Sequence, residues 1–186
     1  MHLAFKKVSS KPSSLKTKLK ELLQLKNKSI RHLVYGATVA ALYVVLTYLS
    51  SLLGLSSGAV QLRLSEALCV LPVFMPSAVP GLFIGCIIAN LVSGSVPLDI
   101  VFGSIATLIG AVGTRLLRKK PILSLIPPIV SNTLIVPPVV FLLYESEATL
   151  AFTYLGVFIG EAVSCGVFGY ILYRALKKNS FFNKEL

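Results

Sequence analysis

Residues 33–53 read LVYGATVAALYVVLTYLSSLL and contain no charged side chain. A helix needs about 20 apolar residues to cross roughly 30 Å of hydrocarbon, so the length of this stretch predicts a membrane-spanning helix. Arg31 precedes the stretch and Gly54 interrupts the apolar pattern after it, which sets the ends of the predicted crossing. The stretch therefore indicates that a bilayer, rather than water, surrounds the protein.

The composition of the whole chain supports this class of protein. Hydrophobic residues make up 55% of the 186 residues and charged residues only 13%, about half of the roughly 25% that soluble domains carry. The net charge of +11 also fits a nucleic-acid-binding protein. The positions of the 18 basic residues argue against that class, because all except Arg63 lie before residue 32, between residues 115 and 120, or from residue 174 onward. Such clusters are typical of cytoplasmic segments under the positive-inside rule.

Residues 62–92 decide how many times the chain crosses the membrane. They contain Pro72, Pro76 and Pro80, which disrupt helices. If the stretch crosses once, the basic cluster at 115–120 falls outside the cell, whereas two crossings place that cluster inside. At 1.5 Å per residue the stretch reaches roughly 46 Å, too little for two full spans of about 30 Å. We therefore predict two helices here, of which one or both are short or broken.

Three further apolar segments predict crossings at about residues 98–117, 122–144 and 149–173. The second of these carries the pairs Pro127–Pro128 and Pro137–Pro138, and each pair is expected to bend the helix. The sequence thus predicts an all-α integral membrane protein of the cell membrane, a multi-pass bundle of six transmembrane helices. Both termini are predicted to be cytoplasmic, because that arrangement places nearly all the basic residues inside.

Two segments flank the predicted membrane domain, which spans residues 31–176. Residues 1–30 form a basic N-terminal extension, and residues 177–186 form a short cytoplasmic tail. Over residues 13–27, leucines recur at helical spacing between lysines, which fits an interfacial helix on the anionic inner surface of the membrane. A disordered basic tail fits the same composition, and both alternatives stay open.

Few polar side chains fall within the predicted crossings, and each is costly there. An acidic residue at the centre of a spanning helix costs roughly 2.5–3.5 kcal/mol, so such a residue normally has a partner or a function. Polar residues from four crossings approach one another in the outer half of the membrane. We predict that they form a substrate-binding site, with Gln61, Arg63, Glu66, Asn90, Asp99, Asn132 and Glu161 as its members.

These residues also have a purely structural interpretation. Arg63 and Glu66 can form an ion pair one turn apart, with Ser65 capping the start of the helix. Asp99 can cap its own helix, and Glu161 can be a carboxyl that hydrogen bonds to Asn132 on the neighbouring helix. Capping alone accounts less well for the convergence of polar residues from four crossings.

No catalytic signature accompanies the predicted site. The sequence contains no Gly-rich phosphate loop, no paired-histidine zinc motif and no Gly-x-Ser-x-Gly nucleophile turn. Cys69, Cys86 and Cys165 lie inside apolar runs without metal-ligand spacing, so we assign them to packing. We predict no enzymatic activity, no metal and no cofactor. Transport against a gradient then needs an ion gradient or another subunit as its source of energy.

Three blocks of this sequence resemble the QueT family: GATVAALYVVLTYL (36–49), QLRLSEALCVLPVFMPSAVPGLFIGCIIANL (61–91) and LDIVFGSIATLIGA (98–111). The resemblance covers about residues 31–175, and its Arg-x-Ser-Glu-Ala-Leu and Leu-Asp-Ile-x-x-Gly motifs carry most of the specificity. QueT proteins are the substrate-binding (S) components of energy-coupling factor (ECF) transporters that take up queuosine precursors. The basic extension before residue 31 departs from the compact start expected of that family.

The resemblance implies a six-helix protein that captures a 7-deazaguanine such as preQ1, or queuine, from the outer side. It also implies partners, namely a transmembrane scaffold subunit and two ATPase subunits that hydrolyse the ATP. Ala37 and Ala41 match the small-residue surface with which such components meet the scaffold. The acids and amides of the predicted site complement a guanine-type edge, and Phe74, Phe83 or Phe102 can stack on its ring.

Three other functions stay open on sequence grounds. An S component for another vitamin, such as a flavin, thiamine or biotin, has the same topology and the same scaffold contact. If the chain is instead a membrane helix bundle without a ligand, or a small membrane enzyme, we expect no saturable binding of a transported ligand. An ion-coupled carrier that works alone is disfavoured, because the chain shows no internal repeat of the kind many such carriers have.

Overall fold

The computed structural model describes residues 13–55, 61–143, 150–179 and 182. Within these ranges all the regular structure is helical, which confirms the predicted all-α class. Residues 1–12 of the predicted N-terminal extension lie outside the described residues, as do 180–181 and 183–186 of the predicted tail.

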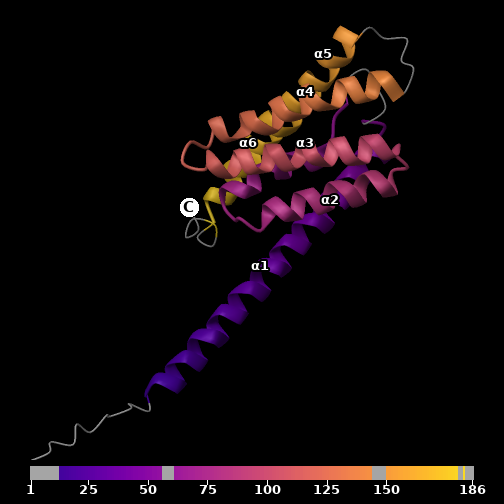
Figure 1. Ribbon diagram of the computed structural model, residues 1–186. Helices are drawn as coiled ribbons and strands as arrows, with labels where there is room; N and C mark the ends of the chain where they lie inside the picture. The colour runs from indigo at the N-terminus through magenta and orange to yellow at the C-terminus, as the bar shows by residue number, and fades with distance from the viewer. Residues whose placement is uncertain (1–12, 56–60, 144–149, 180–181, 183–186) are drawn as a thin grey trace, which may run out of the picture.

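The chain forms α-helices, two 3-10 helices (η1 and η2) and one π-helical segment (η3), with the arrangement drawn in Figure 1. Their order along the chain is α1 (Ser13–Leu52), η1 (Leu64–Val73), α2 (Ala78–Val92), α3 (Pro97–Leu116), η2 (Leu123–Leu125), α4 (Ile126–Leu143), α5 (Leu150–Glu161), η3 (Ala162–Phe168) and α6 (Gly169–Lys177). The last three follow one another without a break and form one long helix.

Four of these stretches are long and apolar enough to cross a membrane, and they are Leu23–Leu52, Pro97–Leu116, Leu123–Phe141 and Leu150–Lys177. Two shorter apolar helices, η1 and α2, occupy the stretch 62–92, with 10 and 15 residues. The six stretches follow the order of the six predicted segments, and the count of six crossings stays a prediction. The structure confirms the prediction that the helices within 62–92 are short, since α2 reaches only about 22 Å at 1.5 Å per residue.

Helix α1 is continuous from Ser13 to Leu52, so the predicted interfacial helix and the first predicted crossing belong to one element. Residues 23–31 are exposed, and the N-terminal part of α1 projects away from the bundle (Figure 1). The helix is followed by Gly54, whose φ of 70° is a left-handed conformation that favours glycine. Contact of the projecting part with a membrane surface stays a prediction.

The short helix η1 lies at the centre of the bundle, where it contacts α1, α3, η3 and α6. Most of its residues are buried, including Glu66 and Cys69. A 3-10 helix of ten residues is unusually long, because its hydrogen bonds are poorer than those of an α-helix. Three residues per turn place Glu66 directly above Cys69 on one face. The fold therefore carries the Glu66 carboxyl inside the bundle rather than against lipid.

Both ends of η1 are anchored by side chains of other helices. At the start, Ser50 Oγ accepts the backbone N–H of Leu64 at 2.9 Å, and the Thr47 hydroxyl donates to Ser65 Oγ at 2.8 Å. At the end, the Arg115 guanidinium donates to the carbonyls of Pro72 and Val73 at 3.0 and 3.1 Å. These bonds fix the position of η1 within the bundle.

Two sequence expectations about local structure are wrong. Ser65 does not cap η1, because its backbone lies inside the helix and Ser50 satisfies the first free N–H instead. Pro127 and Pro128 fall in the first turn of α4, where no intrahelical donor is lost, so only Pro137 and Pro138 lie where a proline removes helical hydrogen bonds.

Helices α1 and α2 pack closely through small residues. A Cβ on Gly81 would lie 2.5 Å from the Gly36 carbonyl oxygen, and a Cβ on Gly85 would lie 3.0 Å from the Ala40 Cα. The close approach therefore depends on glycine at both positions of α2. Small residues thus let the two backbones approach each other, as is common between membrane helices.

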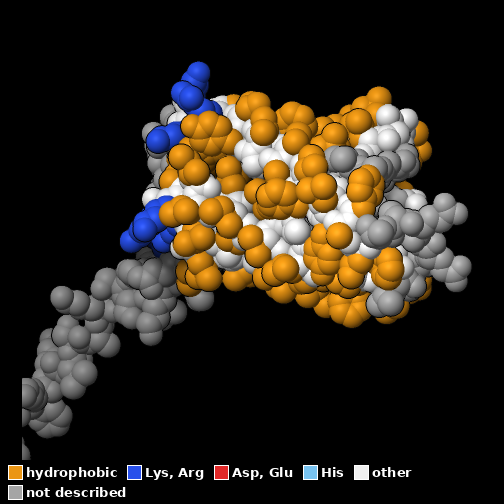
Figure 2. All heavy atoms as spheres, turned by 90° about the horizontal axis from the view of Figure 1, so that it is seen from above, with side chains coloured by type: hydrophobic (Ala, Val, Ile, Leu, Met, Phe, Trp, Pro, Cys, Tyr) orange, Lys and Arg blue, Asp and Glu red, His pale blue; other side chains and the backbone are white. Residues whose placement is uncertain are grey.

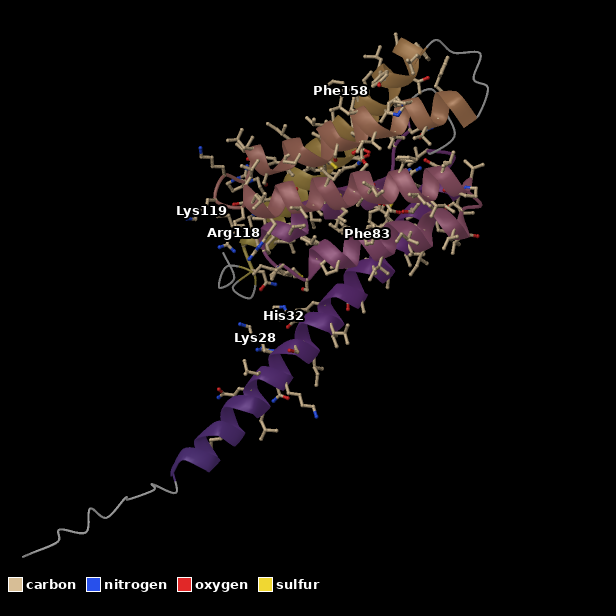
Figure 3. The ribbon with its side chains drawn as sticks, viewed as in Figure 1. Lys28, His32, Phe83, Arg118, Lys119 and Phe158 are labelled. Atoms are coloured by element: carbon tan, nitrogen blue, oxygen red, sulfur yellow. The ribbon has the colours of Figure 1, made fainter. Side chains whose placement is uncertain are left out.

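The outside of the bundle is apolar, as a lipid-facing surface requires. Large hydrophobic side chains on every long helix are exposed, and in Figure 2 they cover most of the visible face. Basic side chains gather at one end in that view, and Figure 3 places Arg118 and Lys119 at the same end of the bundle. This separation of an apolar girdle from a basic end is typical of a membrane protein.

Candidate substrate-binding recess

A recess between η1, α3, α4 and α5 gathers the polar residues of the bundle. It is lined by Gln61, Arg63, Glu66, Asp99, Gly103, Thr107, Asn132, Val136, Val157 and Glu161. Six of the seven residues predicted for the substrate site are among them. The seventh, Asn90, lies behind the wall and accepts a hydrogen bond from Arg63 Nη1 at 3.3 Å. The predicted convergence in space is therefore present.

Glu66 is the centre of the hydrogen-bond network in this recess. Its Oε1 accepts a short hydrogen bond from the Tyr43 hydroxyl of α1. Its Oε2 accepts bonds from the Cys69 thiol at 3.1 Å and from Asn132 Nδ2 at 3.5 Å. The side chain is only 2% exposed. A buried carboxyl with this many donors is held in one orientation, which suits a binding site.

Glu161 occupies the last position of α5, directly before the π segment η3. Its Oε1 accepts a hydrogen bond from Asn132 Nδ2 at 3.0 Å, and its Oε2 accepts one from the Cys165 thiol at 3.4 Å. The expected bond between Glu161 and Asn132 is thus present. Both residues also line the recess. Asn132 joins Glu66 to Glu161, since its amide donates to both carboxyls.

Among the described residues, Arg63 is the only basic one that lines the recess, together with the carboxyls of Glu66, Asp99 and Glu161. Its guanidinium interacts electrostatically with Asp99 and Glu66. The expected ion pair between Arg63 and Glu66 is not formed, because the guanidinium points to Asn90 instead and Glu66 is bonded to Tyr43. The lining therefore has three carboxyls and one guanidinium. Carboxyl groups, which can accept hydrogen bonds, outnumber the fixed positive charge.

The chain at Gln61 lies directly across α5. A Cβ on Gly160 would approach the Gln61 carbonyl oxygen to 2.1 Å, far closer than any real Cβ contact. Glycine at position 160 therefore allows residues 61–63 to lie against α5. This contact closes the recess on one side.

The recess is small in this conformation, about 20 Å³. That volume holds about one water molecule, whereas pockets that bury small molecules measure roughly 300–1,000 Å³. A bicyclic ligand can enter only if the walls separate. In this conformation the recess is thus a closely packed group of polar side chains rather than an open cavity.

The aromatic residues expected to stack on a ligand do not line the recess. Phe74 is fully buried and stacks on Tyr173, with ring centroids 5.5 Å apart. Phe102 is 41% exposed on the outside of α3, and Phe83 lies on α2 (Figure 3). None of these three residues lines the recess in this conformation, so stacking on a ligand stays a prediction. The aromatic residue that the sequence analysis missed is Tyr43, which contacts Glu66 by its hydroxyl.

A second hollow lies on the outside of the bundle, between α1 and α2. It is an apolar groove of about 600 Å³ whose lining includes Gly36, Ala37, Ala40, Ala41 and Ile84. Ala37 and Ala41 are exposed, whereas Ala40 is buried against α2. The two residues predicted to meet a scaffold subunit thus lie on an accessible, small-residue surface.

Comparison with known proteins adds an independent result. The family model of the QueT transporter matches residues 33–178. A protein of Lactococcus lactis subsp. cremoris named queuosine precursor transporter QueT is 35% identical over 85 residues. That match covers 46% of this chain and 50% of the relative, so the chain spans about half the length of the curated relative it matches.

No solved structure matches this chain. The family match includes every described helix that contributes to the recess and to the groove. With its long apolar helices it identifies a multi-pass protein of the cell membrane. The chain belongs to the QueT transporter family.

Proposed function

We propose that this chain is the substrate-binding S component of an ECF transporter and that it captures a 7-deazaguanine queuosine precursor, such as preQ1 or queuine. The observation that carries the proposal is the recess, in which Glu66, Asp99 and Glu161 converge with Asn132 inside an apolar bundle. Polar groups inside a membrane domain are costly, and they mark substrate pathways by default.

The lining complements the edge of a guanine-type ring. Such an edge presents adjacent N–H donors beside a carbonyl acceptor, which a carboxylate and an amide can satisfy together. Glu66 and Glu161 provide carboxyl oxygens on either side of the Asn132 amide. We assign the ring edge to these three residues.

The charge of the lining favours a ligand that carries a cation. Among the described lining residues, three carboxyls face the guanidinium of Arg63, so the carboxyls outnumber the fixed cations by two. The aminomethyl group of preQ1 supplies a cation, and an ammonium–carboxylate hydrogen bond is stronger than a neutral one. We assign this group to Asp99, which lies across the recess at the start of α3. A neutral 7-deazaguanine should therefore bind more weakly than the aminomethyl compound.

Ligand entry requires the closed recess to open. Residues 61–63 directly precede η1, and Gln61 lies against α5 at Gly160. Their movement away from α5 would widen the recess without separating the long helices. The contact at Gly160 then re-forms over the bound ligand.

The proposed orientation follows the positive-inside rule. The basic end of the bundle faces the cytoplasm, and we place both termini on that side. Asp99 of the recess lies in the first turn of α3, at the other end of that helix from Arg115, so we place the recess toward the outer side. Energy comes from two ATPase subunits on a transmembrane scaffold, because no nucleotide-binding motif is present in this sequence. The groove at Ala37 and Ala41 is the proposed contact with that scaffold.

Calorimetric titration of the detergent-purified chain tests the proposal. We expect saturable binding of 7-aminomethyl-7-deazaguanine, weaker binding of its neutral 7-cyano analogue, and no binding of riboflavin, thiamine or biotin. The variants Glu66→Gln, Asp99→Asn and Glu161→Gln should each weaken binding. Equal affinity in all three variants would refute the site assignment. Saturable binding of a vitamin in place of the deazaguanine would refute the assigned substrate.

A further inference from the structure

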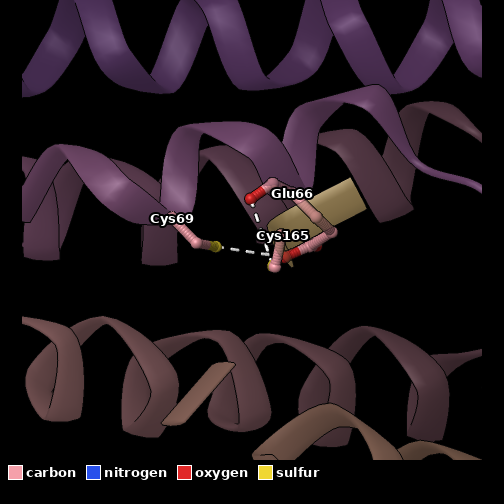
Figure 4. Close-up of side chains that lie close together, drawn as sticks. All are labelled: Glu66, Cys69 and Cys165. Carbon is pink, nitrogen blue, oxygen red and sulfur yellow. Dashed lines mark hydrogen bonds between the residues drawn. The ribbon is translucent and has the colours of Figure 1, made fainter. Parts of the chain in front are cut away.

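Two of the three cysteines lie together beside the recess. The donor atoms of Glu66, Cys69 and Cys165 all lie within 4.8 Å of one another, and all three residues are buried. The Cys69 thiol donates to Glu66 Oε2 at 3.1 Å, and the Cys165 thiol donates to the Glu66 carbonyl at 3.2 Å. Figure 4 shows the side chains of Glu66 and Cys69, both from η1, beside that of Cys165 from η3.

The cluster results from two unusual helical segments. In the 3-10 helix η1, residues three apart lie on the same face, so Cys69 stands one turn from Glu66. In the long C-terminal helix, Cys165 lies within the π segment η3 and contacts Glu161, which is four residues earlier. Contact between η1 and η3 brings the two pairs together.

The assembled donor set has the chemistry of a soft-metal site. Two cysteine sulfurs and the Glu66 carboxyl lie together. Glu161 Oε2 lies 3.4 Å from the Cys165 sulfur, so this second carboxyl is within reach as a fourth ligand. Thiolate ligands select Zn²⁺ and heavier ions of the same kind over Mg²⁺ or Ca²⁺. Metal–sulfur bonds of about 2.3 Å in a tetrahedral site hold donor atoms roughly 3.8 Å apart, close to the spacing here.

The cluster borders the recess. Glu66 and Glu161 both line the recess, so their carboxyls face it from the cluster side. An ion that enters the recess therefore meets a carboxyl first and the two thiols behind it. This position distinguishes Cys69 and Cys165 from Cys86, whose sulfur accepts a hydrogen bond from Thr107 at 3.4 Å and lies outside the cluster.

We propose that Cys69 and Cys165, with the carboxyls of Glu66 and Glu161, form a binding site for a soft divalent cation such as Zn²⁺ or Cd²⁺. On binding, each thiol releases its proton to water as its sulfur bonds to the ion, and no change of oxidation state is involved. The two carboxyls move from hydrogen bonding to coordination of the ion.

Occupancy has a consequence that rests on the proposed function. Because the ion uses Glu66 and Glu161, it removes the two carboxyls assigned to the ring edge of the ligand. The ion and the 7-deazaguanine therefore compete. A soft cation inhibits uptake at this site from the outer side of the membrane.

Cadmium spectroscopy tests the metal site directly. The detergent-purified chain is titrated with CdCl₂, and the ultraviolet charge-transfer band of cadmium–thiolate bonds is measured in the parent and in three serine variants. We expect the band in the parent and in Cys86→Ser, which is the matched control. In Cys69→Ser and Cys165→Ser the apparent affinity for Cd²⁺ should fall at least tenfold. In the parent, added Ca²⁺ should not reduce the binding of Cd²⁺.

The parent alone can overturn the proposal. Absence of a cadmium–thiolate band in the folded parent would contradict it, whatever the variants do, and so would an equal loss of the band in Cys86→Ser. Deazaguanine binding is measured separately by calorimetry on metal-free protein. A cadmium band without deazaguanine binding would refute the proposed function but support the metal site. Deazaguanine binding without a cadmium band would refute the metal site but support the proposed function.

Discussion

The recess and the groove differ in almost every physical property. The recess is polar and buried, measures about 20 Å³, and is held by hydrogen bonds among Glu66, Asn132 and Glu161. The groove is apolar and exposed, measures about 600 Å³, and is lined by small and aliphatic side chains of α1 and α2. The first therefore suits recognition of a small polar molecule, and the second suits close approach of another membrane helix.

The difference separates two steps of transport that can be disrupted one at a time. A change in the recess should alter ligand affinity in the isolated chain. A change in the groove should leave that affinity intact and alter uptake by the assembled transporter. The following experiments sharpen or break this division.

Loss of a carboxyl in the recess is expected to have the largest effect. Glu66→Gln replaces the acceptor at the centre of the network by an amide of similar size. Charged hydrogen bonds contribute about 1.5–3 kcal/mol each, so affinity for 7-aminomethyl-7-deazaguanine should fall roughly 100-fold. Calorimetry measures the loss, and thermal unfolding confirms that the variant folds. Unchanged affinity would remove Glu66 from the site.

A bulky residue in the groove should affect uptake but not binding. Ala41→Leu adds apolar volume to an exposed position, where overpacking of a helix contact costs about 2 kcal/mol, roughly a 30-fold effect on association. ATP-driven uptake in vesicles that contain all subunits measures the effect. The matched control is Ala151→Leu, an exposed alanine on α5 away from the groove. Equal loss of uptake in both variants would show that the groove has no special role.

Gly160→Ala tests how the recess closes. The added Cβ would meet the Gln61 carbonyl oxygen at 2.1 Å, so residues 61–63 must shift away from α5. We expect ligand affinity to fall roughly tenfold, mainly through faster dissociation, because the closed form is strained by about 1–3 kcal/mol. Stopped-flow binding separates the rates. The control is Gly166→Ala, whose Cβ would lie 3.8 Å from its nearest neighbour; dissociation as slow in Gly160→Ala as in this control would contradict the closure.

Tyr43→Phe should have the smallest effect of the four. It removes one hydroxyl donor to Glu66 and leaves the ring in the core. A single hydrogen bond contributes about 1 kcal/mol, so affinity should fall roughly fivefold. Because Tyr43 also lies on the helix that lines the groove, uptake at saturating ligand should be unchanged. A loss of uptake at saturation would mean that the recess and the groove are coupled through α1.

The sequence predicted much of the fold for clear physical reasons. Apolar runs of the right length identified the long crossings, and the placement of basic residues required two helices within 62–92, which the structure contains as η1 and α2. The sequence also predicted which polar residues converge, because an acidic residue inside an apolar segment needs a polar partner to offset the cost of its burial. Six of the seven named residues line one recess.

Other features were beyond sequence reasoning. Cys69 and Cys165 were assigned to packing alone because 95 residues separate them, and only the contact of η1 with η3 joins them. The hydrogen bond of Tyr43 was missed, since a tyrosine in a membrane helix usually lies at the interface. Phe74 was one of three rings that the sequence offered for stacking on the ligand. Its burial against Tyr173 could not be predicted, because that burial depends on η1 being inside the bundle. All three depend on tertiary contacts of one short helix.

Mass spectrometry of the small molecules retained by the purified chain tests the central claim most directly. The chain is isolated from cells grown with 7-aminomethyl-7-deazaguanine, beside a variant that carries Glu66→Gln and Glu161→Gln together. We predict that the parent releases the deazaguanine in near-stoichiometric amount and that the variant releases almost none. Equal recovery from both, or recovery of an unrelated vitamin from the parent, would contradict the assignment of this recess as the binding site for a queuosine precursor.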